Sequence, residues 1–216
     1  MNGLMVEPNQ LRILLERAQS GHRWNVRGDW PSISIQVQGG DSLVSVRKRA
    51  ISEHPELVVC TGLVERANQL RNELAIHPGD MLRIPSEPVH ALIDVSARWM
   101  VYMHGDEAVA AWPIGVGRPG EETPIGQFSV GPKQKDPVWF RPGHEPVAFG
   151  DPENPLGTRW IPWFQNGVKT GYGFHGTNDA DGVGGRVSKG CVRMHNRDVE
   201  ILYEILPQGS RIEVRP

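Results

Sequence analysis

One cysteine and two histidines near the end of the sequence are residue types that nucleophilic catalysis uses. Cys191 stands within Ser-Lys-Gly-Cys-Val-Arg-Met-His-Asn at 188–196, and His175 precedes it in Tyr-Gly-Phe-His-Gly-Thr at 172–177. A free thiol, with a pKa of about 8.5, is mostly protonated at neutral pH, so a catalytic cysteine needs a nearby base. His175 and His195 are the two candidate bases in this part of the sequence.

The glycine before Cys191 favours a sharp turn of the backbone at this position. A residue without a side chain also lets N–H groups approach an incoming carbonyl, as an oxyanion hole requires. We therefore expect the N–H groups of Gly190 and Cys191 to be the donors. Cys60, in contrast, fits a small buried residue. Because the two cysteines fall in different predicted domains, we expect two free thiols.

Two motifs carry a family resemblance. The pattern His-Gly-Thr at 175–177 followed by Ser-x-Gly-Cys-Val-Arg-Met-x-Asn at 188–196 strongly resembles the L,D-transpeptidase (YkuD-type) family, which remodels bacterial peptidoglycan. Segments at 123–128, 154–160 and 202–214 look like the same family, so the resemblance spans roughly the C-terminal three-fifths of the chain. Lys189 stands where many members have histidine.

The resemblance implies a catalytic role for three residues. Cys191 would be the nucleophile and His175 the base, with the carbonyl of Gly176 holding the other ring nitrogen of His175. His195 remains the rival base, although a surface position is the more frequent one for such a histidine. Exchanging each histidine for alanine distinguishes the two assignments.

Three polar residues near the cysteine are expected to contact the substrate. Ser188 begins the matched cysteine motif, Tyr172 lies three residues before His175, and Arg193 follows the cysteine by two positions. A guanidinium binds carboxylates through paired hydrogen bonds, but it also braces loops. For Arg193 both roles stay open.

The implied reaction is acyl transfer on peptidoglycan stem peptides. Cys191 would attack the carbonyl between the third residue, a diamino acid, and the terminal D-alanine, releasing D-alanine and leaving a thioester. An amine acceptor then gives a 3→3 cross-link, and a water acceptor gives a carboxypeptidase. A strained β-lactam such as a carbapenem is expected to acylate the same thiol.

An earlier segment, 32–86, has a different pattern. Residues 32–37 alternate as a strand, Ser42 fits a helix cap, two helical stretches follow, and Met81–Pro85 closes the segment as a strand. The sequences at 37–43, 67–70 and 77–85 resemble a LysM module, which implies binding to glycan strands that contain N-acetylglucosamine. The stretch 52–61 is longer than usual. A wall-binding protein that acts only through this module is the non-catalytic alternative.

The composition is that of a folded protein with many turns. The 216 residues carry a formal net charge of −2 and include 25 Gly and 18 Pro, which favours short strands over long helices. The fold class expected is α+β: a helical segment at 1–31, the LysM-like β-α-α-β module at 32–86, and a mainly-β, sandwich-like or barrel-like catalytic domain at 90–216. The charge gives no reason to expect nucleic-acid binding.

Within the catalytic domain, strands are expected at 91–95, 99–103 and 108–114, forming a mostly antiparallel meander. Asn196 is expected to cap a short helix, and 211–214 is expected to form the last strand. An amphipathic helix is expected at 8–20.

No cofactor is implied by the sequence. A zinc site that uses His175, Cys191, His195 and an aspartate of the loop is a weaker competitor, because no close pair of ligands of the Cys-x-x-Cys or His-x-x-x-His type is present. We expect no membrane-spanning segment and no export signal in the sequence as given, because it shows no apolar run long enough to span a bilayer and no basic region followed by an apolar core at its start. The family substrate nevertheless implies action in the bacterial cell envelope or on spores.

Overall fold

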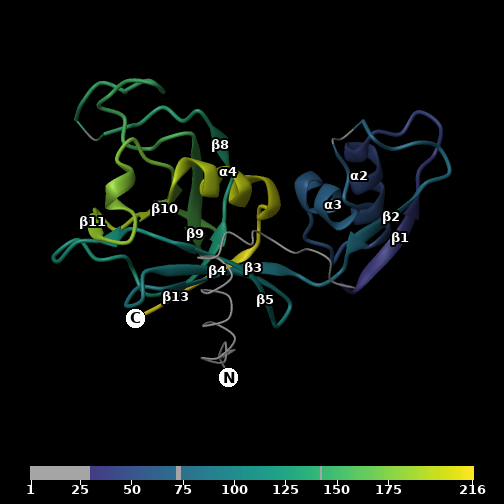
Figure 1. Ribbon diagram of the computed structural model, residues 1–216, viewed down its shortest axis with the longest axis horizontal. Coiled ribbons are helices and arrows are strands. Elements are labelled where there is room, and N and C mark those ends of the chain that lie inside the picture. The colour runs from purple at the N-terminus through teal and green to yellow at the C-terminus, as the bar shows by residue number, and fades with distance from the viewer. Residues whose placement is uncertain (1–29, 72–73, 142) are drawn as a thin grey trace.

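The computed structural model describes residues 30–71, 74–141 and 143–216, which form two lobes joined by the short link 86–88 (Figure 1). The helix predicted at 8–20 lies outside the described residues. The first lobe contains two strands and two helices. The second lobe contains a large sheet that carries the cysteine and histidine motifs.

The first lobe has the predicted element order β-α-α-β. Strands β1 (Ser32–Gln36) and β2 (Met81–Pro85) pair antiparallel, and both helices lie on one side of them (Figure 1). Helix α2 (Leu43–Glu53) begins after Ser42, whose side chain accepts the N–H of Ser45 in a capping box. The predicted cap is therefore confirmed, since this bond satisfies a free N–H of the first turn. Helix α3 (Thr61–Ala67) follows.

The second lobe is built on one nine-stranded curled sheet rather than on two packed sheets. Its strand order is β12-β10-β9-β7-β13-β3-β4-β5, and β8 pairs with β9. Most pairs are antiparallel, as predicted, but β13–β3 and β10–β12 are parallel. The strands are β3 (Val89–Asp94), β4 (Trp99–His104), β5 (Glu107–Pro113), β7 (Gly126–Val130), β8 (Gln134–Lys135), β9 (Arg159–Gln165), β10 (Val168–His175), β12 (Val192–Arg193) and β13 (Arg211–Arg215), with a small separate pair β6 (Val116–Gly117) and β11 (Arg186–Ser188).

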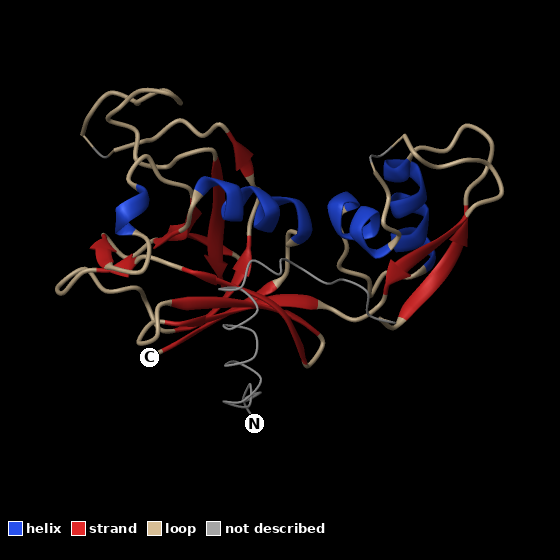
Figure 2. Ribbon diagram, viewed as in Figure 1, coloured by secondary structure: helices blue, strands red, loops and turns tan. Residues whose placement is uncertain are grey.

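Helix α4 (Asn196–Ile205) packs across this sheet (Figure 2). Its apolar face buries Val199, Leu202 and Ile205. The hydroxyl of Tyr102, on β4, donates to the carbonyl of Ile205 at 2.8 Å. This buried bond helps to fix the helix against the sheet, because a buried carbonyl without a partner is costly.

The lobes meet at the C-terminal end of α4. The thiol of Cys60 donates to the carbonyl of Glu204 at 2.9 Å, and the Arg66 guanidinium lies 3.6 Å from the Glu204 carboxylate. Leu57 and Val59, from the stretch 52–61, are buried. A Cβ on Gly62 would lie 2.6 Å from the carbonyl oxygen of Glu204. The end of this stretch, at Cys60, therefore contributes to the junction.

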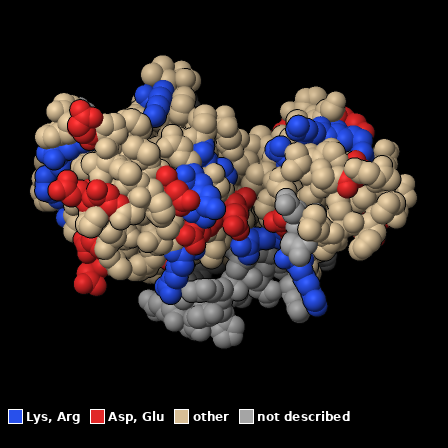
Figure 3. All heavy atoms as spheres, turned by 90° about the horizontal axis from the view of Figure 1, so that it is seen from above, with Lys and Arg blue, Asp and Glu red and all other residues tan. Residues whose placement is uncertain are grey.

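The charged side chains show no dominant sign on the face of the molecule seen in Figure 3, where acidic and basic residues are mixed over the second lobe. This distribution agrees with the small net charge. Among the described residues, no helix has both the length and the apolar character needed to cross a membrane.

Candidate active site

The parallel pairing of β10 with β12 brings the histidine and cysteine motifs together. Phe174 pairs with Val192 and His175 with Arg193, so Cys191, directly before β12, lies opposite Gly173. Side chains alternate along a strand. His175 and Arg193 therefore share one face with Cys191, and Gly173 adds no side chain between them.

Cys191 is partly exposed at the beginning of β12. Its sulfur lies 3.7 Å from the carbonyl oxygen of Gly171. Burial raises the pKa of the Cys191 thiol to about 11, although the N–H of Gly173 partly offsets this by bonding to the sulfur. At neutral pH the resting group is a thiol, so attack requires a base that removes its proton.

His175 is buried, with 4% of its surface exposed. Its Nδ1 lies 2.5 Å from the carbonyl oxygen of Gly176, the contact that the family resemblance implied. A carbonyl only accepts, so Nδ1 carries the proton and Nε2 has a free lone pair. Burial lowers the pKa of His175 to about 4; the Arg193 charge also lowers it, while the Gly176 and Pro155 carbonyls oppose the change. The imidazole is therefore neutral at neutral pH, as a general base must be.

The turn before Cys191 is held by Ser188. The Ser188 hydroxyl accepts the N–H of Gly190 at 3.1 Å and donates to the carbonyl of Cys191 at 2.6 Å. Ser188 is buried and its hydroxyl is used inside the turn, while the expectation that it contacts the substrate stays a prediction. The N–H of Gly190, predicted as an oxyanion donor, is likewise occupied. Among the described residues, the N–H of Cys191 has no hydrogen-bond partner.

Glycine is required at position 190 for two reasons. Gly190 has a φ of +100°, where other residues are strained, and a Cβ there would lie 2.6 Å from the Tyr172 ring. Tyr172, predicted to contact the substrate, is half-buried and packs over this glycine. Its position next to the cysteine turn is compatible with that prediction, which stays untested.

Asn196 is a site residue whose role the sequence reasoning missed. It was expected to cap α4, but the N-cap is His195 and Asn196 is the first helical residue. Its Oδ1 accepts the N–H groups of Thr177 at 3.0 Å and Thr158 at 3.2 Å, and its Nδ2 donates to the carbonyl of Thr177 at 2.9 Å. A Cβ on Gly176 would lie 2.1 Å from Oδ1. Asn196 thus fixes the backbone that directly follows His175.

Arg193 pairs with a carboxylate of the loop between the two motifs. Its Nη1 donates to Oδ2 of Asp179 at 2.8 Å. The loop contains the single 3-10 turn η1 (Ala180–Gly182). Through this ion pair Arg193 braces the loop, which is one of the two roles that the sequence left open. Binding of a substrate carboxylate is the other.

The family model described as the L,D-transpeptidase catalytic domain matches residues 88–214.

The chain belongs to the L,D-transpeptidase family.

Its similarity to named members covers more than the motifs. The chain is 33% identical over 130 residues to the putative L,D-transpeptidase YqjB of Bacillus subtilis, covering 60% of this chain and 72% of that protein. It is 28% identical over 188 residues to the putative L,D-transpeptidase YkuD of the same species, covering 84% and 98%. A crystal structure of an L,D-transpeptidase from Mycobacterium tuberculosis has the same fold, with a TM-score of 0.50 and 13% identity over 88% of this chain and 92% of that one.

The rival base of this L,D-transpeptidase domain lies at a helix end. His195 is the N-cap of α4, and its carbonyl accepts the N–H groups of Asp198 and Val199. Within the described part of the chain, no hydrogen bond joins its ring to Cys191. No group of three or more potential metal ligands is present among those residues either.

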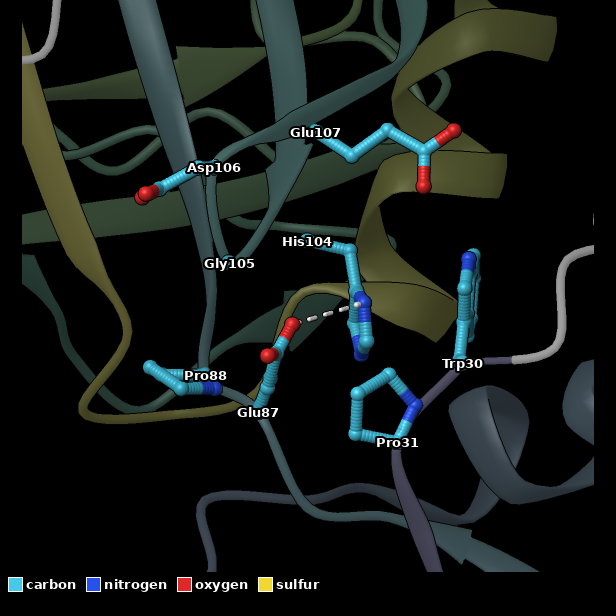
Figure 4. A pocket seen from close by; sticks show the side chains of 8 residues that line it. All are labelled: Trp30, Pro31, Glu87, Pro88, His104, Gly105, Asp106 and Glu107. Carbon is cyan, nitrogen blue, oxygen red and sulfur yellow. Dashed lines mark ion pairs between the residues drawn. The ribbon is translucent and has the colours of Figure 1, made fainter.

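A cavity of about 510 Å³ lies at the lobe junction, away from the cysteine motif. Figure 4 shows the Glu87 carboxylate facing His104, whose ring stacks on Trp30 at 4.2 Å between centroids. The Asp106 and Glu107 side chains point away from that pair (Figure 4). The acidic groups around this cavity therefore do not converge on one ligand position.

Proposed function

We propose that the protein is a peptidoglycan L,D-transpeptidase that uses Cys191 as its nucleophile. The observation that carries this proposal is the shared face of β10 and β12, where a neutral, oriented imidazole accompanies the thiol. Family membership supports the substrate class.

In the proposed first step, Nε2 of His175 removes the thiol proton while sulfur attacks the carbonyl between the third residue and D-alanine. The developing oxyanion accepts a hydrogen bond from the N–H of Cys191. His175 then gives its proton to the departing nitrogen, the C–N bond breaks, and D-alanine leaves. The product is a thioester on Cys191.

In the second step the thioester is attacked by an amine of a neighbouring stem peptide. His175 accepts the proton of the attacking amine and returns it to sulfur as the C–S bond breaks. An amide, the 3→3 cross-link, results. With water as acceptor, the same steps give a carboxypeptidase and a free tripeptide.

The test is incubation with a stem tetrapeptide, followed by detection of D-alanine, tripeptide and cross-linked dimer by mass spectrometry. Dimer formation supports the transpeptidase, and tripeptide alone supports the carboxypeptidase. No D-alanine release from the wild type, under conditions where the protein is folded, would contradict both.

We also propose that the first lobe is a LysM-like module that binds glycan strands containing N-acetylglucosamine. Its support is the β-α-α-β order, with both helices on one side of the antiparallel pair. Titration of full-length Cys191→Ala protein with N-acetylglucosamine oligomers tests this, with glucose oligomers as the control. Equal or absent binding of both would contradict it. The proposed place of action, the bacterial cell envelope or spore, follows from these substrates.

A further inference from the structure

Arg193 is a mostly buried cation beside the cysteine and histidine pair. Its side chain is 14% exposed, whereas that of its partner Asp179 is 58% exposed. The Arg193 charge is close enough to His175 to lower the pKa of the imidazole. A cation next to the catalytic pair is therefore neutralised by a carboxylate that water reaches.

The arginine is the fixed member of this ion pair. The N–H and carbonyl of Arg193 both bond to Gly115 at 2.8 Å, and a Cβ on Gly182 would lie 2.4 Å from Nη1. Its Nε is buried and has no partner among the described residues. The Arg193 guanidinium is thus held in place while its Nε–H group remains without a hydrogen-bond acceptor among the described residues.

Asp179 is the member that can move. Its side chain lies on the exposed loop between the motifs, and its backbone is anchored separately, with its N–H donating to the Thr177 hydroxyl at 2.9 Å. Rotation of the Asp179 side chain into water would leave this backbone bond intact. Because the Asp179 side chain is 58% exposed, water can solvate its carboxylate once the carboxylate leaves Arg193.

A substrate carboxylate fits the same position. Cys191 and Arg193 lie two residues apart on one strand edge, about 6 to 7 Å between Cα atoms. In the proposed reaction, the terminal carboxylate lies one residue beyond the scissile carbonyl, about 3.5 Å of chain. A long arginine side chain spans the remaining distance.

Building on the proposed function, we propose that Asp179 occupies the position on Arg193 that the terminal carboxylate of the donor stem peptide takes. The peptide displaces Asp179, and Arg193 thereby selects donor peptides that end in a free carboxylate. Asp179 sets the affinity for that carboxylate because it competes for the guanidinium.

The test measures equilibrium binding in the Cys191→Ala background, which requires no turnover. The ligands are a stem tetrapeptide with a free terminal carboxylate and the same peptide with a terminal amide. Asp179→Asn removes the competing charge, and Asp181→Asn, on the same turn, removes an equal charge from the loop without touching the pair. Arg193→Gln removes the shared partner.

The expected result is a selective gain in affinity. Asp179→Asn lowers the Kd for the acid peptide about two- to fivefold, leaves the amide peptide unchanged, and has no effect in the presence of Arg193→Gln. Asp181→Asn changes neither Kd by as much as twofold. An unchanged or weaker acid affinity in Asp179→Asn, or equal changes for both peptides, overturns the inference.

The two proposals fail in different ways. If the wild type releases no D-alanine but Asp179→Asn still binds the acid peptide selectively, the function is wrong and the carboxylate site stands. If turnover occurs without this selectivity, the function stands and Arg193 is a brace only.

Discussion

The two cysteines, Cys60 and Cys191, show that the pKa of a thiol does not by itself distinguish a nucleophile from a structural residue. Burial raises the pKa of both thiols. Cys60 lies near the cations Lys133 and Arg47, which favour its thiolate, yet its thiol donates to a carbonyl at the lobe junction. Cys191 has no such cation among the causes of its shift but shares a strand face with His175. The base and its orientation therefore distinguish the proposed nucleophile.

The largest contrast is expected from removing each thiol in turn. Cys191→Ala should reduce D-alanine release to background, about 10³-fold or more, because no other group forms the thioester. Cys60→Ala should stay within about twofold, since its thiol only caps a carbonyl. The rates are measured with stem tetrapeptide. Loss of activity in Cys60→Ala at unchanged melting temperature would break the comparison.

The next contrast separates the two histidines. His175→Ala should lower kcat about 10²- to 10⁴-fold, the usual contribution of a general base. His195→Ala is the matched control, and its kcat should change by less than about tenfold. Steady-state kinetics of both variants decide the assignment. Full activity in His175→Ala would overturn it.

A smaller effect is expected at Asn196, which holds the backbone after His175. Asn196→Ala should lower kcat about tenfold to a hundredfold with little change in KM, because small displacements of a catalytic group are costly. Asn178→Ala, which loses one exposed bond to Pro152, is the control. If Asn196→Ala lowers only the melting temperature and leaves kcat unchanged, Asn196 is merely structural.

The smallest effects concern pH. The pKa of His175 is about 4 in the folded protein and about 6.5 in the unfolded chain. As pH falls from about 6.5 to 4, the unfolded chain therefore binds a proton at this residue before the folded protein does, and the free energy of unfolding decreases. As pH rises above about 9, the unfolded chain loses the Cys191 thiol proton before the folded protein does, because the folded-state pKa is about 11, and the free energy of unfolding decreases again. Denaturant unfolding from pH 4 to 10, with His175→Gln and Cys191→Ala as references, measures both. If kcat/KM instead falls on the acid side with a midpoint near pH 6.5, His175 is solvated in the free enzyme and this account of its burial is contradicted.

Local patterns predicted the elements well where the signal lies within a few residues. The strand Met81–Pro85, the three strands of the meander and the cap at Ser42 agree with the structure. The strands depend on short runs of alternating or continuous apolar residues, and the cap depends on a bond between residues three apart; the sequence displays both directly.

The site was less predictable because its bonds join distant segments. Asn196 fits a cap in sequence, but its partners Thr177 and Thr158 lie 19 and 38 residues away. Ser188 was predicted to contact the substrate, and the sequence did not show that its hydroxyl accepts the N–H of Gly190 within the turn. The motifs predicted that the histidine and cysteine segments lie together. Which N–H groups bond inside the turn, as that of Gly190 does, depended on the folded backbone.

Peptide mapping after reaction with a carbapenem tests the central claim most directly. The account predicts one adduct, on the peptide containing Cys191, in the wild type and in Cys60→Ala, with none in Cys191→Ala and much slower formation in His175→Ala. An adduct on Cys60, or equal rates with and without His175, would contradict a thiol activated by the imidazole on its strand face.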